Sequence, residues 1–199
     1  MQGAAVTRTL ESLPGMAGVL RLRTGGAYAV DSPGLAMALM AGPSQAGEWT
    51  AVVGAPDFGL EAAAELGVDL QRMVVVPRPG EHWLSVTAGL LDVVGVVVVR
   101  PPAPVTEHQA ERLRARLRQK DAALVCWGSW PRCDATLSVS DSSWLGLGHG
   151  HGHLRARQVV VTVSQGGPVR RVPLWLPGLD RQIAERELAP VPLTIAQAG

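Results

Sequence analysis

The stretch Ala27–Gly42, with the sequence AYAVDSPGLAMALMAG, decides which fold the rest of the chain can adopt. It begins with a short β-prone run, continues through a tight turn that contains Pro33 and Gly34, and ends in an alanine- and leucine-rich segment typical of a helix. In many α/β proteins, a strand–turn–helix unit of this kind holds phosphate groups at the helix N-terminus. The unit therefore predicts an α/β fold and raises the question of whether a nucleotide binds there.

Valine-rich runs alternate with helical segments over most of the chain. The expected strands contain YAV, TAVVG, MVVVP, GVVVVR and AALVCW, and the expected helices lie near 35–40, in LEAAAEL, in HWLSVTAGLLDV and over Glu107–Lys120. Continuous apolar strands separated by helices indicate a parallel sheet that is covered on both faces. After Trp130 the runs ATLSVS, LRARQVVVTVS and VRRVPLWLP follow one another with only turns between them, which predicts an antiparallel extension.

The length and composition indicate one domain with a segment at each end. A chain of 199 residues with 47% hydrophobic residues can bury a sizeable core. We expect an N-terminal lead-in arm over 1–17, a core over 18–177 and a C-terminal tail over 178–199. Within the tail, LDRQIAEREL is expected to form a short helix that Pro190 and Pro192 prevent from continuing.

The bulk properties exclude several classes of function. A net charge of +1 creates no global field that would attract nucleic acid or a membrane. The longest apolar run is far shorter than the ~20 residues that a membrane span requires, and no secretory signal is recognisable at the N-terminus. Cys126 and Cys133 could form a disulfide, but a reduced pair is the simpler interpretation for an intracellular chain. We therefore expect a cytoplasmic protein without a membrane partner.

The turn between the first strand and its helix lacks the chemistry of a phosphate loop. Such a loop needs glycines for close backbone approach, a lysine for the phosphate charge and a hydroxyl for Mg²⁺. Here Asp31 places a negative charge where phosphate oxygens would lie, and Pro33 removes a backbone donor. Ser32, together with Asp31, is better explained as a helix N-cap. Residues Asp31, Ser32, Pro33 and Gly34 thus form a degenerate phosphate loop, and we expect no bound cofactor.

The other catalytic positions of a nucleotide-hydrolysing fold differ as well. An acidic residue usually ends the central strand and holds the metal ion. In this chain GVVVVRPP ends in Arg100, and the neighbouring strand offers only Asp57, displaced beyond Pro56. The sole lysine, Lys120, belongs to another element. The phosphate-loop residues, the metal-binding acid and the second acid are thus all missing from their expected positions, which argues against nucleotide hydrolysis.

Two adjacent segments carry a resemblance to a known family. The segment Ala62–Val76, AAAELGVDLQRMVVV, resembles the A-x-x-LGVD-(I/L)-x-x-L phrase of the ATP-binding core of the RecA recombinase family. The following RPGEHWLSVTAGLLDVVGVVVV is similar to the next helix and central strand of RecA in order and spacing. The likeness extends from about residue 18 to 177. It implies a RecA-like core with a mainly parallel sheet flanked by helices, extended by antiparallel C-terminal strands.

The departures from RecA narrow the resemblance further. Because a long N-terminal polymerisation helix and a C-terminal domain are missing and the phosphate loop is degenerate, the chain is similar to the shortened RecA-like accessory proteins of bacterial mutagenesis cassettes. These are the ImuA type, and the actinobacterial ImuA-prime branch has the most similar phosphate loop. The resemblance implies a non-catalytic adaptor in SOS mutagenesis and translesion synthesis that follows DNA damage.

The implied partners are a Y-family-polymerase-like protein of the mutasome and an error-prone DNA polymerase, with single-stranded DNA as a further candidate. Two alternatives stay open at this stage. One is a DNA-binding regulator of recombination. The other is a nucleotide- or metal-dependent hydrolase that uses a nonstandard site.

The segment LGLGHGHGHLRAR offers candidate metal and DNA ligands. His149, His151 and His153 would lie on one side of an extended chain and could bind Zn²⁺ or Ni²⁺, although a loop with incidental histidines is the simpler interpretation. The RecA resemblance places this segment near the DNA-facing region of recombinases, which makes His151, Arg155 and Arg157 candidate DNA-binding residues.

Two further features allow both a binding and a structural interpretation. The arginine-rich helix over 107–120 could contact phosphates, but a solvated helix face is the simpler interpretation. Near the C-terminus, apolar side chains could either complete the core or anchor a partner. The candidate partner-binding residues are Trp175, Leu176, Leu179, Ile183 and Leu188.

Overall fold

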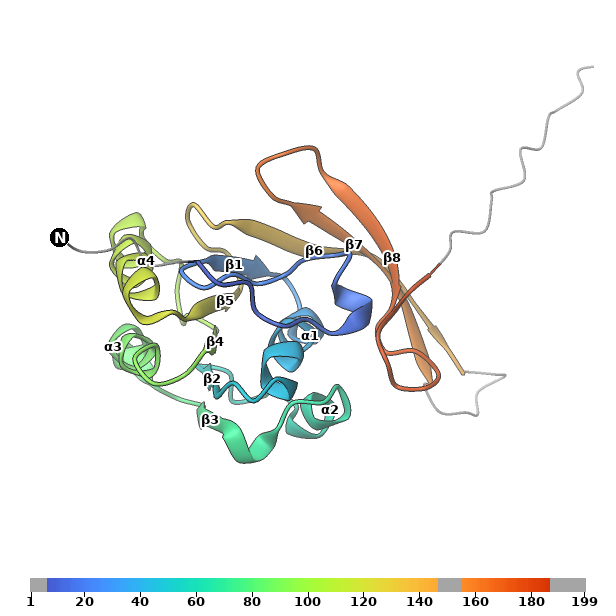
Figure 1. Ribbon diagram of the computed structural model, residues 1–199, viewed down its shortest axis with the longest axis horizontal. Coiled ribbons are helices and arrows are strands. Elements are labelled where there is room, and N and C mark those ends of the chain that lie inside the picture. The colour runs from blue at the N-terminus through green and yellow to red at the C-terminus, as the bar shows by residue number, and fades with distance from the viewer. Residues whose placement is uncertain (1–6, 147–154, 187–199) are drawn as a thin grey trace, which may run out of the picture.

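A computed structural model describes residues 7–146 and 155–186 of the chain. Within these residues, strands form one mixed sheet in the order β3-β2-β4-β5-β1-β6-β7-β8-β9 (Figure 1). The strands are β1 (Ala27–Val30), β2 (Thr50–Val53), β3 (Met73–Val76), β4 (Val96–Val99), β5 (Ala123–Trp127), β6 (Ala135–Leu145), β7 (Ala156–Ser164), β8 (Arg170–Trp175) and β9 (Ala184–Glu185). The helices are α1 (Pro33–Gln45), α2 (Leu60–Glu65), α3 (Trp83–Leu90) and α4 (Glu107–Lys120), with 3₁₀ turns η1 (Pro14–Met16), η2 (Leu70–Arg72) and η3 (Gly80–His82).

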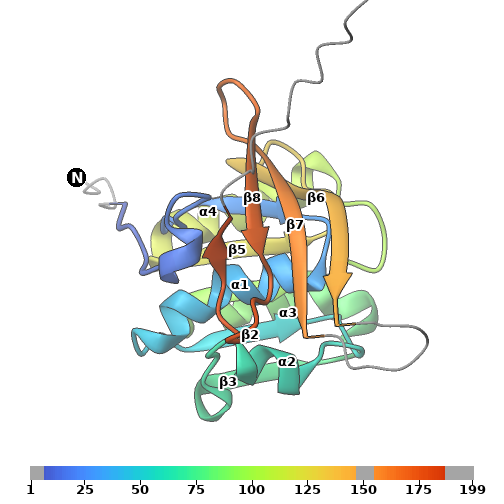
Figure 2. The same ribbon diagram turned by 90° about the vertical axis from the view of Figure 1, so that its right-hand side faces the viewer.

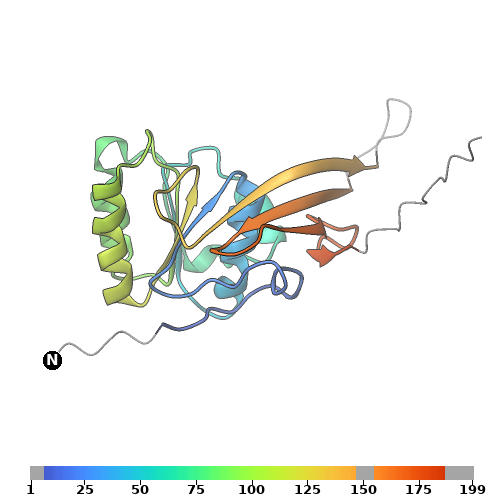
Figure 3. The ribbon, with the colours of Figure 1, turned by 90° about the horizontal axis from the view of Figure 1, so that it is seen from above.

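The predicted fold class is confirmed at the level of an α/β protein with a mostly parallel sheet and antiparallel C-terminal strands. Strands β1 to β5 pair in parallel, as their valine-rich sequences predict. Strand β6 belongs to both parts of the sheet, because it pairs in parallel with β1 and antiparallel with β7. The antiparallel extension of β6, β7 and β8 projects beyond the helices, as Figure 3 shows.

Two apolar clusters, one on each face of the sheet, form the core. Alternate residues of each parallel strand point to opposite faces. Tyr28 and Val30 of β1 belong to the cluster that includes α1, whereas Ala27 and Ala29 belong to the cluster that includes α4. Helices α3 and α4 therefore cover one face, and α1 covers the other (Figure 3).

The N-terminal segment packs into the same core as the parallel strands. Leu10, Leu13 and Met16 are buried in the cluster that contains α1. The backbone of Leu10 donates a hydrogen bond to Leu22, which holds this segment against the chain that leads into β1. Residues 7–16 thus contribute apolar burial to the core.

The expected C-terminal helix is wrong for the part of the tail that the structure describes. Arg181 has a left-handed backbone with φ of 62°, and Asp180 accepts a hydrogen bond from the backbone of Gln182, so the chain turns instead of coiling. It then forms β9, which pairs with β8 at the edge of the sheet (Figure 2). The buried Ile183 lies so close to Gly15 of η1 that any side chain at residue 15 would collide with it. Edge pairing and burial thus outweigh the helical pattern of the sequence.

The first turn of α1 is stabilised by an N-cap. The Ser32 hydroxyl accepts a hydrogen bond from the backbone of Leu35 at 3.4 Å, and Pro33 occupies the first turn, where a missing N–H costs nothing. The expectation that Ser32 caps the helix is confirmed. Asp31 was expected to share this role, but its carboxylate accepts a hydrogen bond from the backbone of Val139 instead.

Replacing Ser32 by Ala is predicted to lower the free energy of unfolding by about 1 kcal/mol, because the first turn of α1 loses its cap. Urea denaturation measures this change. Ser143→Ala is the matched control, because Ser143 is exposed and its side chain makes no hydrogen bond to the described residues. Equal stability of the two variants would contradict the capping role.

Candidate functional site

The carboxyl ends of the parallel strands meet at one edge of the sheet, where α/β proteins usually bind ligands. Asp31 follows β1, Gly54 follows β2 and Arg100 follows β4. Trp127 ends β5 on the other side of β4. These residues stand where the phosphate loop and the metal-binding acid of a nucleotide-binding fold would lie.

Arg100 is held by an acidic and an aromatic side chain at this edge. Its guanidinium donates two hydrogen bonds to the Asp57 carboxylate, at 2.8 and 3.0 Å, and lies 4.3 Å from the centre of the Trp127 ring. The hydrogen bond from Arg100 holds the pKa of Asp57 below its usual range. Gly54 has φ of 78° and lies directly against the Arg100 carbonyl, where a side chain could not fit. The side chain that follows β4 is thus a cation whose partners, Asp57 and Trp127, lie within the described residues.

Asp31 ties the phosphate-loop region to the antiparallel extension. Its carboxylate accepts the backbone N–H of Val139 at 2.9 Å, and its own N–H donates to the Leu137 carbonyl at 3.3 Å. Strand β6 changes register between Val139 and Asp141, so the bond from Asp31 is made next to an irregularity of the ladder. The carboxylate has a structural role at the point where phosphate oxygens would otherwise approach.

An apolar pocket lies over the first turns of α1. Its volume is about 220 Å³. The apolar pocket is lined by side chains and backbone of α1, the end of α2, β6 and the segment after β8: Pro33, Gly34, Met37, Leu66, Trp144, Leu176 and Pro177. These seven residues offer mainly van der Waals surface.

Two arginines form the polar rim of the apolar pocket. Arg181 pairs with Glu65 of α2 at 2.9 Å. Arg157 of β7 lies 5.7 Å from the centre of the Trp144 ring and donates to the Ser142 hydroxyl at 2.8 Å. Within the described ranges, Arg157 has no carboxylate partner. The rim therefore carries one cation that a negatively charged group could approach.

A second, more open crevice lies between the ends of β1, β5 and β6. It has a volume of about 450 Å³ and includes Asp31, Ser129, Trp130 and Ser138. None of its lining residues is a cation. Lys120, the only lysine of the chain, lies at the end of α4, 3.8 Å from Asp92. The residues at this edge of the sheet therefore do not fit a nucleoside triphosphate with its metal ion.

The structure brings together three groups of residues that the sequence analysis treated separately. Gly34 of the degenerate phosphate loop, Arg157 of the candidate DNA-binding set and Leu176 of the candidate partner-binding set all line the apolar pocket. Met37 and Leu66 also line the apolar pocket and were not among the sequence candidates. Their helical spacing indicates burial, but nothing in the spacing shows that they face a cavity.

The remaining candidates are dispersed or lie outside the described residues. Trp175 is half-buried in β8, Ile183 is buried and Leu179 is 71% exposed. Arg155 is exposed just before β7. The candidate metal ligands His149, His151 and His153 and the candidate partner residue Leu188 lie outside the described residues.

Other chemistry at the described residues is limited. No group of three or more histidine, cysteine or acidic side chains that could hold a metal ion occurs in residues 7–146 and 155–186. Cys126 and Cys133 are both free thiols, and burial raises the pKa of Cys126 to about 12. Across the same residues, no helix has the length and apolar character needed to cross a membrane.

The described residues define an α/β protein whose mostly parallel sheet is flanked by helices and extended by antiparallel strands. Residues 15–132 match the model of the MT3502 N-terminal domain family, and the chain belongs to this family. The matched region ends before β6. The chain is also similar to the uncharacterized protein Rv3395c of Mycobacterium tuberculosis, with 37% identity over 113 residues. This match covers 56% of the chain and 49% of the relative, so the chain spans about half the length of that relative.

The carboxyl group of Asp57 is predicted to titrate below its ordinary pKa of 3.8, because Arg100 donates hydrogen bonds to its charged form. Carboxyl-carbon NMR measures this pKa, and Arg100→Gln should return it toward 3.8. A lowered pKa contributes its full stabilisation of the folded state above the unfolded pKa and loses it as the pH falls through the folded pKa. The stability difference between the unmodified chain and Arg100→Gln that comes from this pair should therefore disappear over that range.

Arg78→Gln is the control for this titration, because Arg78 is exposed, makes no ion pair within the described residues and undergoes the same change in charge. If both substitutions shift the pKa of Asp57 equally, the shift is a general charge effect, which would contradict a specific pair of Asp57 with Arg100.

Proposed function

We propose that this protein is a non-catalytic, RecA-like accessory protein in DNA-damage-induced mutagenesis and translesion synthesis. In this role it acts as an adaptor that binds a Y-family-polymerase-like partner. The sequence resemblance of Ala62–Val76 and of the following helix and strand motivates the family assignment. The observation that carries the adaptor role is the apolar pocket over the first turns of α1, where a phosphate-binding protein would present donors.

Two features at the edge of the sheet support an adaptor over an enzyme. The Arg100 guanidinium is engaged by Asp57 and Trp127, so a metal-binding acid is replaced by a satisfied cation. The Asp31 carboxylate is engaged by the backbone of β6. Both side chains are therefore held by contacts within the chain. This supports a structural role for the end of the sheet at which many α/β enzymes carry out catalysis.

The shape and charge of the apolar pocket favour one kind of occupant, an apolar side chain of a partner segment. A volume of about 220 Å³ suits a single large apolar side chain. Burying such a side chain contributes about 1.5–3 kcal/mol to binding. Because Arg157 lies at the rim with no carboxylate partner in the described residues, an acidic residue beside the apolar anchor would add charge complementarity.

A pocket-filling substitution tests this function. Gly34 has an ordinary backbone conformation, and a Cβ there would meet its nearest neighbour, Leu176 Cδ2, at 3.8 Å, which is normal van der Waals contact. Gly34→Leu is therefore predicted to fold normally, fill the apolar pocket and weaken binding of the Y-family-polymerase-like partner at least tenfold. Co-purification and surface plasmon resonance with that partner measure the effect.

Gly89→Leu in α3 provides the matched control, because a Cβ at Gly89 would meet no atom within 4 Å and Gly89 does not line the apolar pocket. This variant should bind the partner as the unmodified chain does. Failure of the unmodified chain to bind the partner would overturn the proposed function. Normal binding by Gly34→Leu would leave an adaptor but reject the apolar pocket as its docking site.

A further inference from the structure

The opposite end of the parallel strands, where β1 begins, carries another pocket of different chemistry. This basic pocket has a volume of about 430 Å³. The residues that matter for its chemistry come from the segment before β1, from β1 and α4, and from the turn before β6: Arg23, Thr24, Tyr28, Arg114, Arg118 and Asp134. It lies at the amino end of β1 and is separate from the edge that ends in Asp31.

Two buried hydroxyl groups line the basic pocket, each with a proton to donate. Tyr28 is 2% exposed, and its hydroxyl accepts the backbone N–H of Arg23 at 2.8 Å. Thr24 is 3% exposed, and its hydroxyl accepts the backbone N–H of Arg8 at 2.9 Å. A hydroxyl can accept and donate at once, yet neither proton has an acceptor among the described residues. Each hydroxyl can therefore donate to an acceptor that enters the basic pocket.

The charges around the two hydroxyls have an excess of cations. Asp134 is satisfied by the backbone N–H of Ala27 and by Arg114, at 2.8 and 2.9 Å. Arg23 and Arg118 are exposed, and neither makes an ion pair or a side-chain hydrogen bond with the residues that the structure describes. The basic pocket therefore has two free guanidinium groups beside one neutralised pair.

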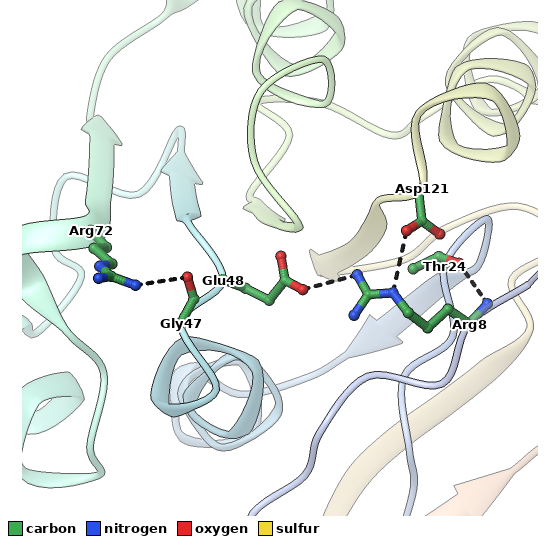
Figure 4. A network of polar contacts seen from close by, with 6 residues as sticks. All are labelled: Arg8, Thr24, Gly47, Glu48, Arg72 and Asp121. Atoms are coloured by element: carbon green, nitrogen blue, oxygen red, sulfur yellow. Dashed lines mark hydrogen bonds and ion pairs between the residues drawn. The ribbon is translucent and has the colours of Figure 1, made fainter.

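The neighbouring Arg8 shows how a cation is neutralised when a carboxylate is within reach. Its guanidinium pairs with Glu48 at 2.9 Å and with Asp121 at 3.3 Å, while its backbone binds Thr24 (Figure 4). In contrast, the Arg118 side chain lies beside Gly25 and makes no ion pair with a carboxylate of the described residues. The free cations of the basic pocket are thus a local feature of this edge.

We propose that the basic pocket binds a phosphate group, free or carried on a nucleic-acid chain. A phosphate offers oxygens to both hydroxyl protons and negative charge to Arg23 and Arg118. Burial raises the pKa of Tyr28, with the nearby Asp134 charge acting in the same direction, so the hydroxyl keeps its proton near neutral pH. This site is independent of the partner-binding function proposed for the other edge of the sheet.

Calorimetric titration of the full chain at low salt tests the proposal. The probes are inorganic phosphate and a single-stranded thymidine oligonucleotide with or without a 5′-phosphate. Tyr28→Phe keeps the buried ring and removes the donor, so it should weaken binding about tenfold, the usual loss for a hydrogen bond to a charged group. Arg118→Ala, at an exposed position, should weaken binding by a similar factor.

Arg112→Ala is the control, because Arg112 lies on the same helix, is exposed and does not line the basic pocket. Binding that requires the 5′-phosphate assigns a terminal phosphate, and equal binding of both oligonucleotides assigns the backbone. Binding of inorganic phosphate alone assigns a free anion. The proposal is overturned if no probe binds at millimolar concentration. It is also overturned if Arg112→Ala and Arg118→Ala weaken binding equally, or if Tyr28→Phe binds as the unmodified chain does.

Discussion

The parallel pairing of β6 with β1 is the contact on which the arrangement of both parts of the sheet depends. It is supported by the Asp31 carboxylate, which accepts the backbone N–H of Val139. Because β1 also pairs with β5, it joins the parallel strands to the antiparallel extension. The same pairing brings Trp144 and the segment after β8 over the first turn of α1. The apolar pocket therefore exists because the extension is attached at this strand.

The two ends of β1 have opposite chemistry. At its carboxyl end, Arg100 and Asp57 satisfy each other, and the apolar pocket lies over the first turns of α1. At its amino end, buried hydroxyls and two guanidinium groups without an ion pair in the described residues gather around a polar cavity. An apolar cavity gains by excluding water from another apolar surface, whereas a cluster of donors gains by binding an anion. One sheet can thus support protein docking at one edge and anion binding at the other.

The sequence predicts the parallel strands and the Ser32 cap well, because both depend on local patterns. Continuous valine runs predict buried parallel strands, and a serine before proline at a helix start predicts a cap. The prediction of a C-terminal helix is wrong because β8 offers an edge for pairing and Ile183 is buried against η1. Neither contact is visible in a local sequence pattern. Intrinsic helix preference is small beside such tertiary contacts.

The pockets were harder to predict than the strands. Arg157 and Leu176 were both candidates, but only the register of β6, β7 and β8 shows that they face the same cavity as Gly34. The basic pocket is not predictable from the sequence, because Thr24 and Tyr28 look like ordinary core or turn residues there. Their importance appears only when the partners of each hydroxyl are counted.

We propose that the carboxyl edge of the sheet does not bind a nucleoside triphosphate. Isothermal titration calorimetry with ATP, in the presence and absence of Mg²⁺, tests it most directly. We expect no saturable binding in the micromolar range, because Asp31 and Pro33 offer no phosphate donor at the start of α1 and the Arg100 side chain is held by Asp57 and Trp127. Saturable micromolar binding that is lost on changing Asp31 or Ser32 to Ala would contradict it.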